Sequence, residues 1–384
     1  MSLTIPRYKW AVLFSLVALP FLWTAAKAQT AKELHLETGE EIFQGTCAGC
    51  HGPDGKGQQQ HILGFEPPAT FPDFTDCSGS SRESNTQWSA VIHQGGTARS
   101  FSTIMPSFGP KENPALTDDE IKKVIGYLRT FCTEDPKWPS GDFNTPRPMF
   151  TEKAFPEDEL ITYNTVNLTG TAGYNNNLII EKRLGAITNI EIRFRGNFTK
   201  QAAGGWLGDV GDTSFEFKRS LLVNNKKGTL LGWGNEITVA TGNPKLGGNG
   251  VHRYEQFLTL TQLLPKRAYF LVQAGGEVSI FHRHQSPAEV YTRSAIGKTF
   301  LADRTMGRAF SLTNEFVAIR KFGPQQAWTL DVVPQAQITV SKRQHMRLGM
   351  GVNIPAVNVQ SRSTQLVFYW LWDTFDGGFF EGWK

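Results

Sequence analysis

Several common sequence features are scarce or missing in this chain of 384 residues. Each absence limits the classes of protein to which the chain can belong. The formal net charge is only +4 and no run of basic residues occurs, so charge gives no reason to expect a nucleic-acid partner. The apolar stretch near the N-terminus, from Trp10 to Trp23, is shorter than the eighteen or so residues of a membrane-spanning helix. No low-complexity tract and no fixed-period repeat is present, and there are four cysteines.

The first segment has the layout of an export signal. Arg7 and Lys9 form a short positive region, the apolar stretch follows, and Ala26-Lys27-Ala28 places small residues where a signal peptidase cleaves. We therefore predict that residues 1–28 are a signal peptide that is removed on export. The alternative is an uncleaved anchor, and the short apolar stretch argues against it.

Two of the four cysteines belong to the motif Cys47-Ala48-Gly49-Cys50-His51. Thiols three positions apart can add to the two vinyl groups of one haem, and the next residue offers an imidazole to the iron, which is the attachment pattern of haem c. Covalent haem attachment takes place outside the cytoplasm, in agreement with the export signal. The motif predicts one covalently bound haem c, joined to Cys47 and Cys50, with His51 as an axial ligand of the iron.

The other two cysteines, Cys77 and Cys132, remain once the haem has taken its pair. In an oxidising periplasm two such thiols tend to form a disulfide, which here would join the middle loop of the haem domain to the end of its last helix. The alternative is that they are unrelated core residues, because free cysteine is often buried.

Two helices are predicted to flank the haem motif. The first contains Gly39 and Phe43. The second begins after Thr117, which can cap it, and has acidic residues in its first turn, where the helix dipole favours them. We expect the two helices to cross near Gly39 and Tyr127 and to hold the edge of the haem. The apolar face of the second helix carries Ile121, Val124, Ile125 and Leu128.

This arrangement resembles the class I cytochrome c family over residues 29–132. The resemblance rests on the two helices, the haem motif followed by Gly52 and Gly55, and a Met-Pro loop before the last helix. In that family the sixth iron ligand is a methionine in this loop, and Met105-Pro106 holds that place here. The resemblance implies an all-α monohaem domain in which His51 and Met105 are the axial ligands and no coordination position is open.

Other interpretations of the sixth ligand stay open. Met105 can be a core residue, since methionine often fills gaps in cores. The other methionine of the mature N-terminal half, Met149, lies beyond the last predicted helix. The rival ligand is His93, with His61 and His35 as weaker candidates.

Residues 133–158 separate the two halves of the chain. Such a proline-rich, polar segment is extended and semi-rigid, so we predict a linker and a domain boundary. Its prolines are Pro136, Pro139, Pro146, Pro148 and Pro156.

After the linker the apolar period changes from that of a helix to that of a strand. About twelve alternating segments follow, separated by clusters of asparagine and glycine. The clearest two, 328–340 and 346–354, are joined by a polar turn ending at His345, and they predict a long antiparallel hairpin. We expect an antiparallel all-β domain over residues 159–384.

The alternation of apolar and polar residues alone does not show which face of the sheet contacts water. In a soluble sandwich the apolar face forms the core, whereas in a membrane barrel it faces lipid. The segment 328–340 alternates for thirteen residues, longer than ordinary globular strands and long enough to cross a membrane. We therefore predict a transmembrane β-barrel of about 12 strands, with a β-sandwich as the alternative.

A cytochrome c domain joined to a barrel resembles the fused cytochrome–porin proteins of bacterial outer membranes, some of which are implicated in oxidising ferrous iron. The resemblance implies a c-type cytochrome tethered to the outer membrane that transfers electrons at the periplasmic face or across the envelope. Its partners would be a redox protein and outer-membrane lipid, without nucleic acid. The alternatives are a ferrous-iron-oxidising cytochrome–porin and a soluble periplasmic electron carrier whose sandwich docks a partner.

Size predicts where the haem domain lies. A folded domain of about 100 residues has a radius of gyration near 13 Å. It does not fit inside a barrel of about twelve strands. We expect it beside the periplasmic mouth of the barrel.

Overall fold

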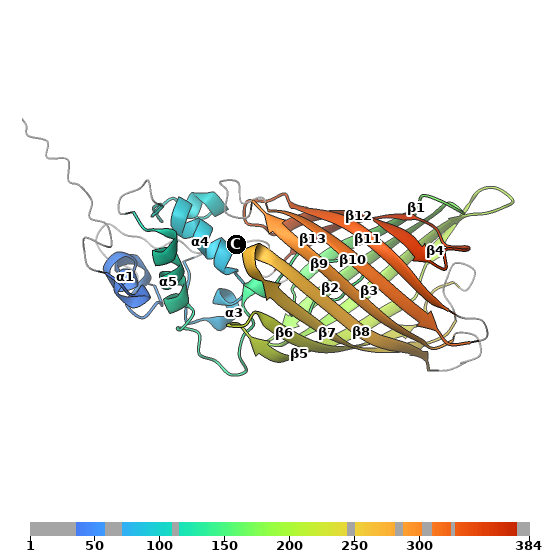
Figure 1. Ribbon diagram of the computed structural model, residues 1–384, viewed down its shortest axis with the longest axis horizontal. Coiled ribbons are helices and arrows are strands. Elements are labelled where there is room, and N and C mark those ends of the chain that lie inside the picture. Colours follow the sequence, from blue (N-terminus) through green and yellow to red (C-terminus); the bar gives the residue numbers. More distant parts are fainter. Residues whose placement is uncertain are drawn as a thin grey trace, which may run out of the picture.

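The computed structural model describes residues 36–57, 71–109, 115–243, 250–280, 287–301, 309–323 and 327–374. The predicted signal peptide, His35 and His61 lie outside these residues. Figure 1 shows a helical domain at one end of a barrel of tilted strands. Within the described ranges, no helix combines the length and the apolar character needed to cross a bilayer.

Short helices with well-defined starts build the helical domain. Helix α1 (Gly39–Thr46) begins after Thr38 and α5 (Asp118–Leu128) begins after Thr117. In both, the threonine side chain accepts a hydrogen bond from the backbone three residues on, and a glutamate there returns one. The cap predicted at Thr117 is therefore confirmed. The other helical elements are α2 (Ala48–His51), α3 (Cys77–Ser80), α4 (Asn85–Gln94), η1 (Gly96–Arg99), η2 (Gly141–Phe143) and η4 (Pro265–Arg267).

Helices α1 and α5 cross at the predicted place. A Cβ atom on Gly39 would lie 2.1 Å from the carbonyl oxygen of Lys123 and 3.1 Å from Cβ of Tyr127, so only glycine allows this approach. Phe43 packs with its ring centroid 5.6 Å from those of both Tyr127 and Phe131. The crossing fixes one wall of the domain's core.

The second part of the chain is a closed antiparallel barrel. Its sheet contains thirteen strands, and pairing of β2 with β3 closes it. Because β4 and β5 follow one another along β3, the closed wall has twelve strands, which confirms the predicted fold class. The strands are β1 (Glu159–Asn167), β2 (Gly173–Leu184), β3 (Thr188–Lys200), β4 (Trp206–Val210), β5 (Thr213–Asn224), β6 (Thr229–Val239), β7 (Arg253–Leu264), β8 (Ala268–Ser279), β9 (Glu289–Phe300), β10 (Phe310–Lys321), β11 (Trp328–Thr339), β12 (Met346–Val357) and β13 (Gln365–Asp373).

The barrel wall is apolar outside and largely polar inside, where one cluster of buried apolar side chains packs around Met149. On β5, Phe215 is 50% exposed, whereas its neighbours Glu216 and Lys218 are 5% and 1% exposed. The predicted hairpin of β11 and β12 repeats the pattern, with Ile338 and Met350 exposed and the polar side chains between them buried. A soluble sandwich has the opposite arrangement, so the sandwich alternative is wrong.

The lumen of this barrel is occupied by the chain itself. Residues 144–158, here called the lumen segment, make hydrogen bonds to inward side chains on strands all around the wall. These wall residues are Glu181, Ser220, Thr259, Gln273, Glu315, Gln337 and Tyr369. Because no outer surface could contact so many strands of a closed sheet, the segment lies inside. The sequence analysis gave this stretch only the role of a linker.

Glu315, in the middle of β10, holds the central part of the lumen segment. Its carboxylate accepts backbone N–H groups of Met149, Phe150 and Thr151 at 2.9, 3.0 and 2.5 Å. The Thr151 hydroxyl donates to the same carboxylate at 2.6 Å. Hydrogen bonds to a charged acceptor are among the stronger ones in proteins, so this carboxylate is the main anchor of the segment.

Charged side chains of the segment also pair with the wall. Arg147 lies 2.6 Å from Glu181 and 3.5 Å from Glu159, and Lys153 pairs with Glu157 and lies 3.7 Å from Glu159. All five side chains are at most 8% exposed. Buried charges are costly unless they are paired, so wall and segment depend on each other.

Inward aromatic side chains leave room for the segment by lying flat on the wall. Tyr369 faces Gly349 on the neighbouring strand, where a Cβ atom would lie 2.3 Å from the tyrosine ring. Tyr269 and Gly297 repeat this pairing with the same 2.3 Å approach. Glycine at these positions keeps the centre of the barrel free.

We predict that Glu315→Ala loosens the lumen segment. The substitution leaves three backbone N–H groups without their acceptor, at a cost of about 1–3 kcal/mol each. Ala154→Cys, at a position that is fully buried in the segment, provides a reporter thiol. We expect slow maleimide labelling of this thiol in the parent protein and much faster labelling in the Glu315→Ala background. Glu289→Ala, which removes a wall carboxylate paired with Lys321 instead, is the control. Equal labelling rates in all three proteins would contradict the prediction.

Candidate functional site

An apolar pocket of about 310 Å³ lies in the helical domain. Its lining includes Cys47, Cys50, His51 and Met105, which are the four residues that the sequence assigned to the haem. Apolar side chains form most of the remaining wall, namely Phe43, Phe71, Phe74, Trp88, Ile92, Phe108, Val124 and Leu128. The fold therefore brings together the residues that haem attachment requires, inside a lining that suits an apolar macrocycle.

The haem motif follows directly from the end of α1. The backbone N–H of Cys47 donates to the carbonyl of Phe43, and α2 continues from there to His51. Cys47 and Cys50 are both free thiols, the first half-buried and the second exposed. Burial raises the pKa of Cys47. Gly52, with φ of 73°, ends this helix in a conformation that favours glycine.

His51 has the environment of a ligand rather than of a surface histidine. Its ring stacks on Phe71 with centroids 4.9 Å apart and lies 5.2 Å from the ring of Phe74. Burial lowers the pKa of His51 to about 4, so the imidazole is neutral, which is the form that binds metals. Its Nδ1 is buried without a hydrogen-bond partner among the residues that the structure describes. A half-buried, neutral imidazole with an unpaired Nδ1, beside two free thiols, fits a covalently held haem.

Two glycines at the end of α4 position the loop of Met105. The backbone N–H of Gly96 donates to the carbonyl of Met105 at 3.1 Å. A Cβ atom on Gly96 would lie 2.3 Å from the carbonyl oxygen of Ser102. Gly95 has φ of 77°, and a Cβ there would lie 2.9 Å from the Met105 carbonyl oxygen. The loop can therefore pack tightly against α4, with Met105 in the wall of the pocket.

His93, the rival ligand, is placed differently. Its Nε2 lies 2.9 Å from a carboxylate oxygen of Asp118, and its carbonyl accepts hydrogen bonds from the hydroxyl of Ser107 and the N–H of Gly109. It is not among the residues that line the pocket. His93 thus ties α4 to α5 and to the loop after Met105.

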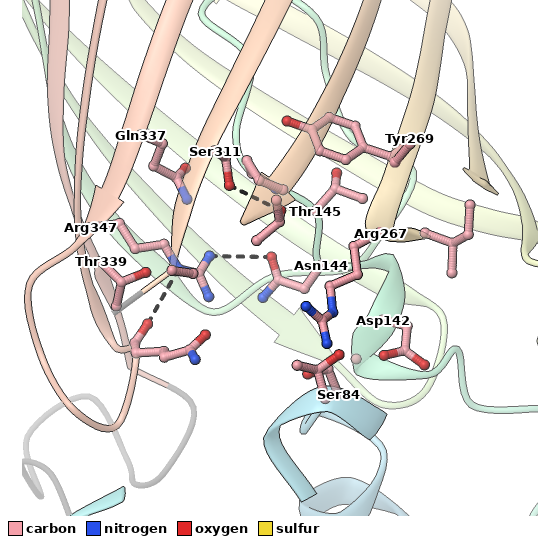
Figure 2. Close-up of a pocket in the computed structure, with 18 of the residues that line it drawn as sticks. Ser84, Asp142, Asn144, Thr145, Arg267, Tyr269, Ser311, Gln337, Thr339 and Arg347 are labelled. Atoms are coloured by element: carbon pink, nitrogen blue, oxygen red, sulfur yellow. Dashed lines mark hydrogen bonds between the residues drawn. The ribbon is translucent and has the colours of Figure 1, made fainter. Parts of the chain in front are cut away.

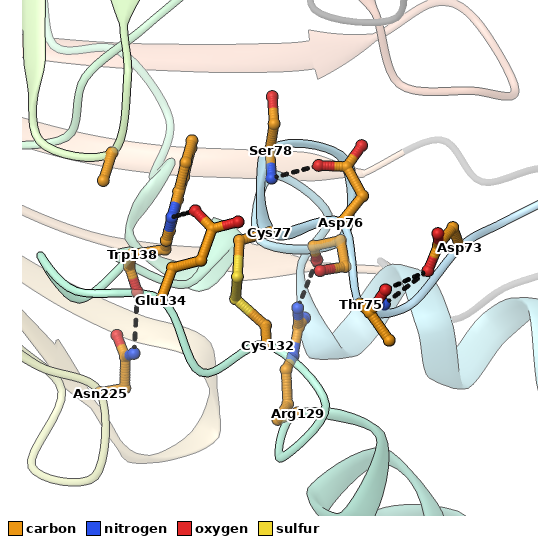
Figure 3. Close-up of a disulfide and its surroundings, with 12 residues drawn as sticks. Asp73, Thr75, Asp76, Cys77, Ser78, Arg129, Cys132, Glu134, Trp138 and Asn225 are labelled. Carbon is orange, nitrogen blue, oxygen red and sulfur yellow. Dashed lines mark hydrogen bonds between the residues drawn. A yellow bond between two sulfur atoms is a disulfide. The ribbon is translucent and has the colours of Figure 1, made fainter. Parts of the chain in front are cut away.

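A disulfide closes the domain on the side toward the barrel. Figure 3 shows the bond between Cys77 and Cys132, with an S–S distance of 2.01 Å. Beside it, Asn225 from the β5–β6 turn of the barrel donates to the carbonyl of Trp138 at 3.1 Å and accepts from the N–H of Ser140 at 3.0 Å. The chain that leaves the disulfide is therefore held against the barrel within a few residues.

A second cavity of about 290 Å³, with polar and apolar side chains in its wall, lies between the helical domain and the barrel mouth. Figure 2 shows Ser84 and Asp142 on the helical side, with Arg267 and Arg347 on the barrel side. Arg347 reaches Asn144 of the lumen segment at 3.5 Å. None of the predicted haem residues lines this cavity, so it belongs to the junction of the two parts and not to the haem site.

Comparison with known proteins gives a family for the first part of the chain. Residues 36–131 match the family model of cytochrome c. No curated protein matches the chain.

Several solved structures are similar to the barrel. An outer-membrane channel from Pseudomonas putida F1 has a TM-score of 0.42 at 14% identity, covering 59% of this chain and 99% of its own. The NanC porin has a TM-score of 0.39 and the KdgM porin one of 0.37, both at 10% identity, covering 56% of this chain and 98% of their own.

The first part of the chain is thus a cytochrome c domain, which implies covalently bound haem c and electron transfer. It is followed by a closed antiparallel barrel of twelve strands, and this order of parts agrees with the predicted resemblance to fused cytochrome–porin proteins.

Many residues of the pocket wall were not anticipated from the sequence, among them Arg99, Phe101 and Arg343. Arg99 and Phe101 lie between α4 and Met105, and Arg343 belongs to the turn between β11 and β12. The first two lie in a segment where spacing gives no helix signal. Arg343 is separated from the haem motif by most of the chain, so only the docking of the barrel on the domain reveals it.

We predict that Gly96→Ala destabilises the haem domain by about 2 kcal/mol, because the new methyl group meets a backbone oxygen that cannot move freely. Gly126→Ala is the matched control. It is exposed on α5 and has nothing within 4 Å of the added Cβ, so alanine should stabilise the helix by up to about 1 kcal/mol. The measurement is denaturant unfolding followed at the haem Soret band. If Gly96→Ala left the free energy of unfolding unchanged, the Met105 loop would not pack as described.

Proposed function

We propose that this chain is a monohaem c-type cytochrome anchored in the outer membrane, which transfers single electrons on the periplasmic side. The observation that carries the proposal is one apolar pocket that holds the free thiols of Cys47 and Cys50 together with His51 and Met105, beside the mouth of a closed barrel. A bound haem c supplies a one-electron Fe(III)/Fe(II) couple.

Each of the four residues has a separate role in the proposal. Cys47 and Cys50 hold the haem through thioether bonds. His51 and Met105 would bind the haem iron and would leave no position on it for a substrate. A filled coordination sphere supports electron transfer over chemistry on a bound substrate.

The barrel surface supports the membrane anchor. The outward side chains of the wall are large and apolar, including Phe215, Phe217, Leu312, Phe316, Ile338 and Met350, as expected where a barrel meets lipid. The connections at the haem end include the short turns 185–187, 225–228 and 265–267, whereas the longer connection 240–252 is at the opposite end. Short turns are typical of the periplasmic end, which supports a periplasmic haem domain.

The filled lumen argues against the alternative function, a ferrous-iron-oxidising cytochrome–porin. For ferrous-iron oxidation with supply through the barrel, iron would have to pass residues such as Thr151, Lys153 and Ala154, which are at most 3% exposed. One haem at the mouth also cannot span an apolar band about 25 Å tall. Electron exchange with a separate redox protein is therefore the function that the geometry supports best.

Localisation and cofactor can be tested together. We expect a haem-staining band of the mature chain in the outer-membrane fraction, resistant to alkaline washing because the barrel is inserted in lipid. The double variant Cys47→Ser, Cys50→Ser should keep this location and lose the covalent stain. Haem-staining protein that washes off, or a mature chain without the mass of a haem, would refute the proposal.

The axial ligand has its own test. Met105→Ala should abolish the weak near-infrared charge-transfer band of a methionine-ligated ferric haem, because the thioether is gone. His93→Ala should leave this band in place, since His93 bonds to Asp118 outside the pocket. Survival of the band in Met105→Ala would show that another residue is the sixth ligand.

A further inference from the structure

We propose that the β11–β12 turn of the barrel is part of the haem site, where Arg343 of this turn and Arg99 of η1 hold the propionate edge of the haem and set its reduction potential. The inference rests on the covalent haem proposed above. It makes the barrel a component of the redox centre and not only its anchor.

The pocket extends from the attachment cysteines to the barrel. Its lining includes Cys47 and Cys50, but also Arg99 and Arg343. Cys47 directly follows α1, which lies at the end of the helical domain farthest from the barrel in Figure 1. Arg343 belongs to the barrel mouth. The vinyl and propionate groups of a haem are on opposite edges of the ring, so attachment through the cysteines would direct the propionates toward the barrel.

The two arginines are held in place by contacts that cross the junction. Arg99 is 2% exposed and donates through Nη1 to the carbonyl of Lys342 at 3.3 Å. Arg343 donates through Nη2 to the carbonyl of Ser100 at 3.1 Å, and its guanidinium lies 4.9 Å from the ring centroid of Phe101. Each arginine thus contacts the backbone of the other part of the protein.

The backbone at the junction adds a second observation. Ser100 has φ of 60°, a left-handed conformation that costs a non-glycine residue about 1 kcal/mol or more. This conformation ends η1 and directs the Ser100 carbonyl to Arg343. Strained residues persist where the surrounding structure requires them, often at functional sites.

The chemistry of the two side chains matches the propionates. A guanidinium group is planar and always charged, and it binds carboxylates through two parallel hydrogen bonds. The haem would present two carboxylates to this end of the pocket. Because reduction of the iron removes one positive charge from the centre, a neighbouring cation favours the reduced state and raises the potential.

The test is a redox titration of the full-length holoprotein with three variants. Arg343→Gln should lower the midpoint potential, because it removes a half-buried charge at the haem edge. Arg343→Lys keeps the charge and should restore most of the potential. Lys342→Gln is the matched control, since it removes the same charge from the neighbouring position, where the side chain is exposed and does not line the pocket. Solvent and salt screen that charge, so we expect little shift.

Resonance Raman spectra of the propionate bending modes give an independent readout. They should change in Arg343→Gln and stay unchanged in Lys342→Gln. An unchanged potential with unchanged propionate modes in Arg343→Gln would overturn the inference. Equal shifts in Arg343→Gln and Arg343→Lys would also overturn it, because they would show that the residue only docks the two parts. Absence of covalent haem in the parent protein would instead refute the proposed function.

Discussion

The buried charged side chains inside the barrel are the constraint on which the rest of this structure depends. A wall that is apolar outside must turn its charged side chains inward, and twelve strands enclose more space than those side chains fill by themselves. The lumen segment fills it and supplies Arg147 and Lys153 to the buried carboxylates of Glu159 and Glu181. Removing one member of a buried ion pair typically costs about 3–5 kcal/mol, so segment and wall stabilise each other.

This constraint also fixes the position of the haem domain. The lumen segment begins at residue 144, twelve residues after the disulfide at Cys132. The stretch between them is held by Asn225 of the barrel, and Arg82 of the domain pairs with Asp158 at 2.9 Å. A domain connected in this way has little freedom to move, because its exit from the disulfide and its entry into the barrel are both anchored.

The features that the sequence predicted are those that depend on neighbours along the chain. The haem motif, the cap at Thr117 and the alternation of β11 are local patterns, and the structure has the corresponding elements. Strand length distinguished a barrel from a sandwich because a lipid-facing strand must cross a layer of fixed thickness. The lumen segment and Arg343 could not be predicted, since each depends on contacts between residues far apart in sequence. Prolines at 146, 148 and 156 indicate an extended segment equally well outside and inside a barrel.

A fixed haem has a consequence for how electrons reach it. In a tethered cytochrome the flexible chain lets the haem travel between donor and acceptor, and the length of the tether sets its reach. Here most of the proline-rich stretch lies inside the barrel as the lumen segment. Contacts of Arg82, Arg99 and Arg343 hold the haem domain at the mouth of the barrel. The haem of the proposed site therefore cannot move between an electron donor and an electron acceptor. Under the proposed function, a redox partner has to dock at this fixed position, where both the barrel mouth and the cytochrome domain border the haem pocket.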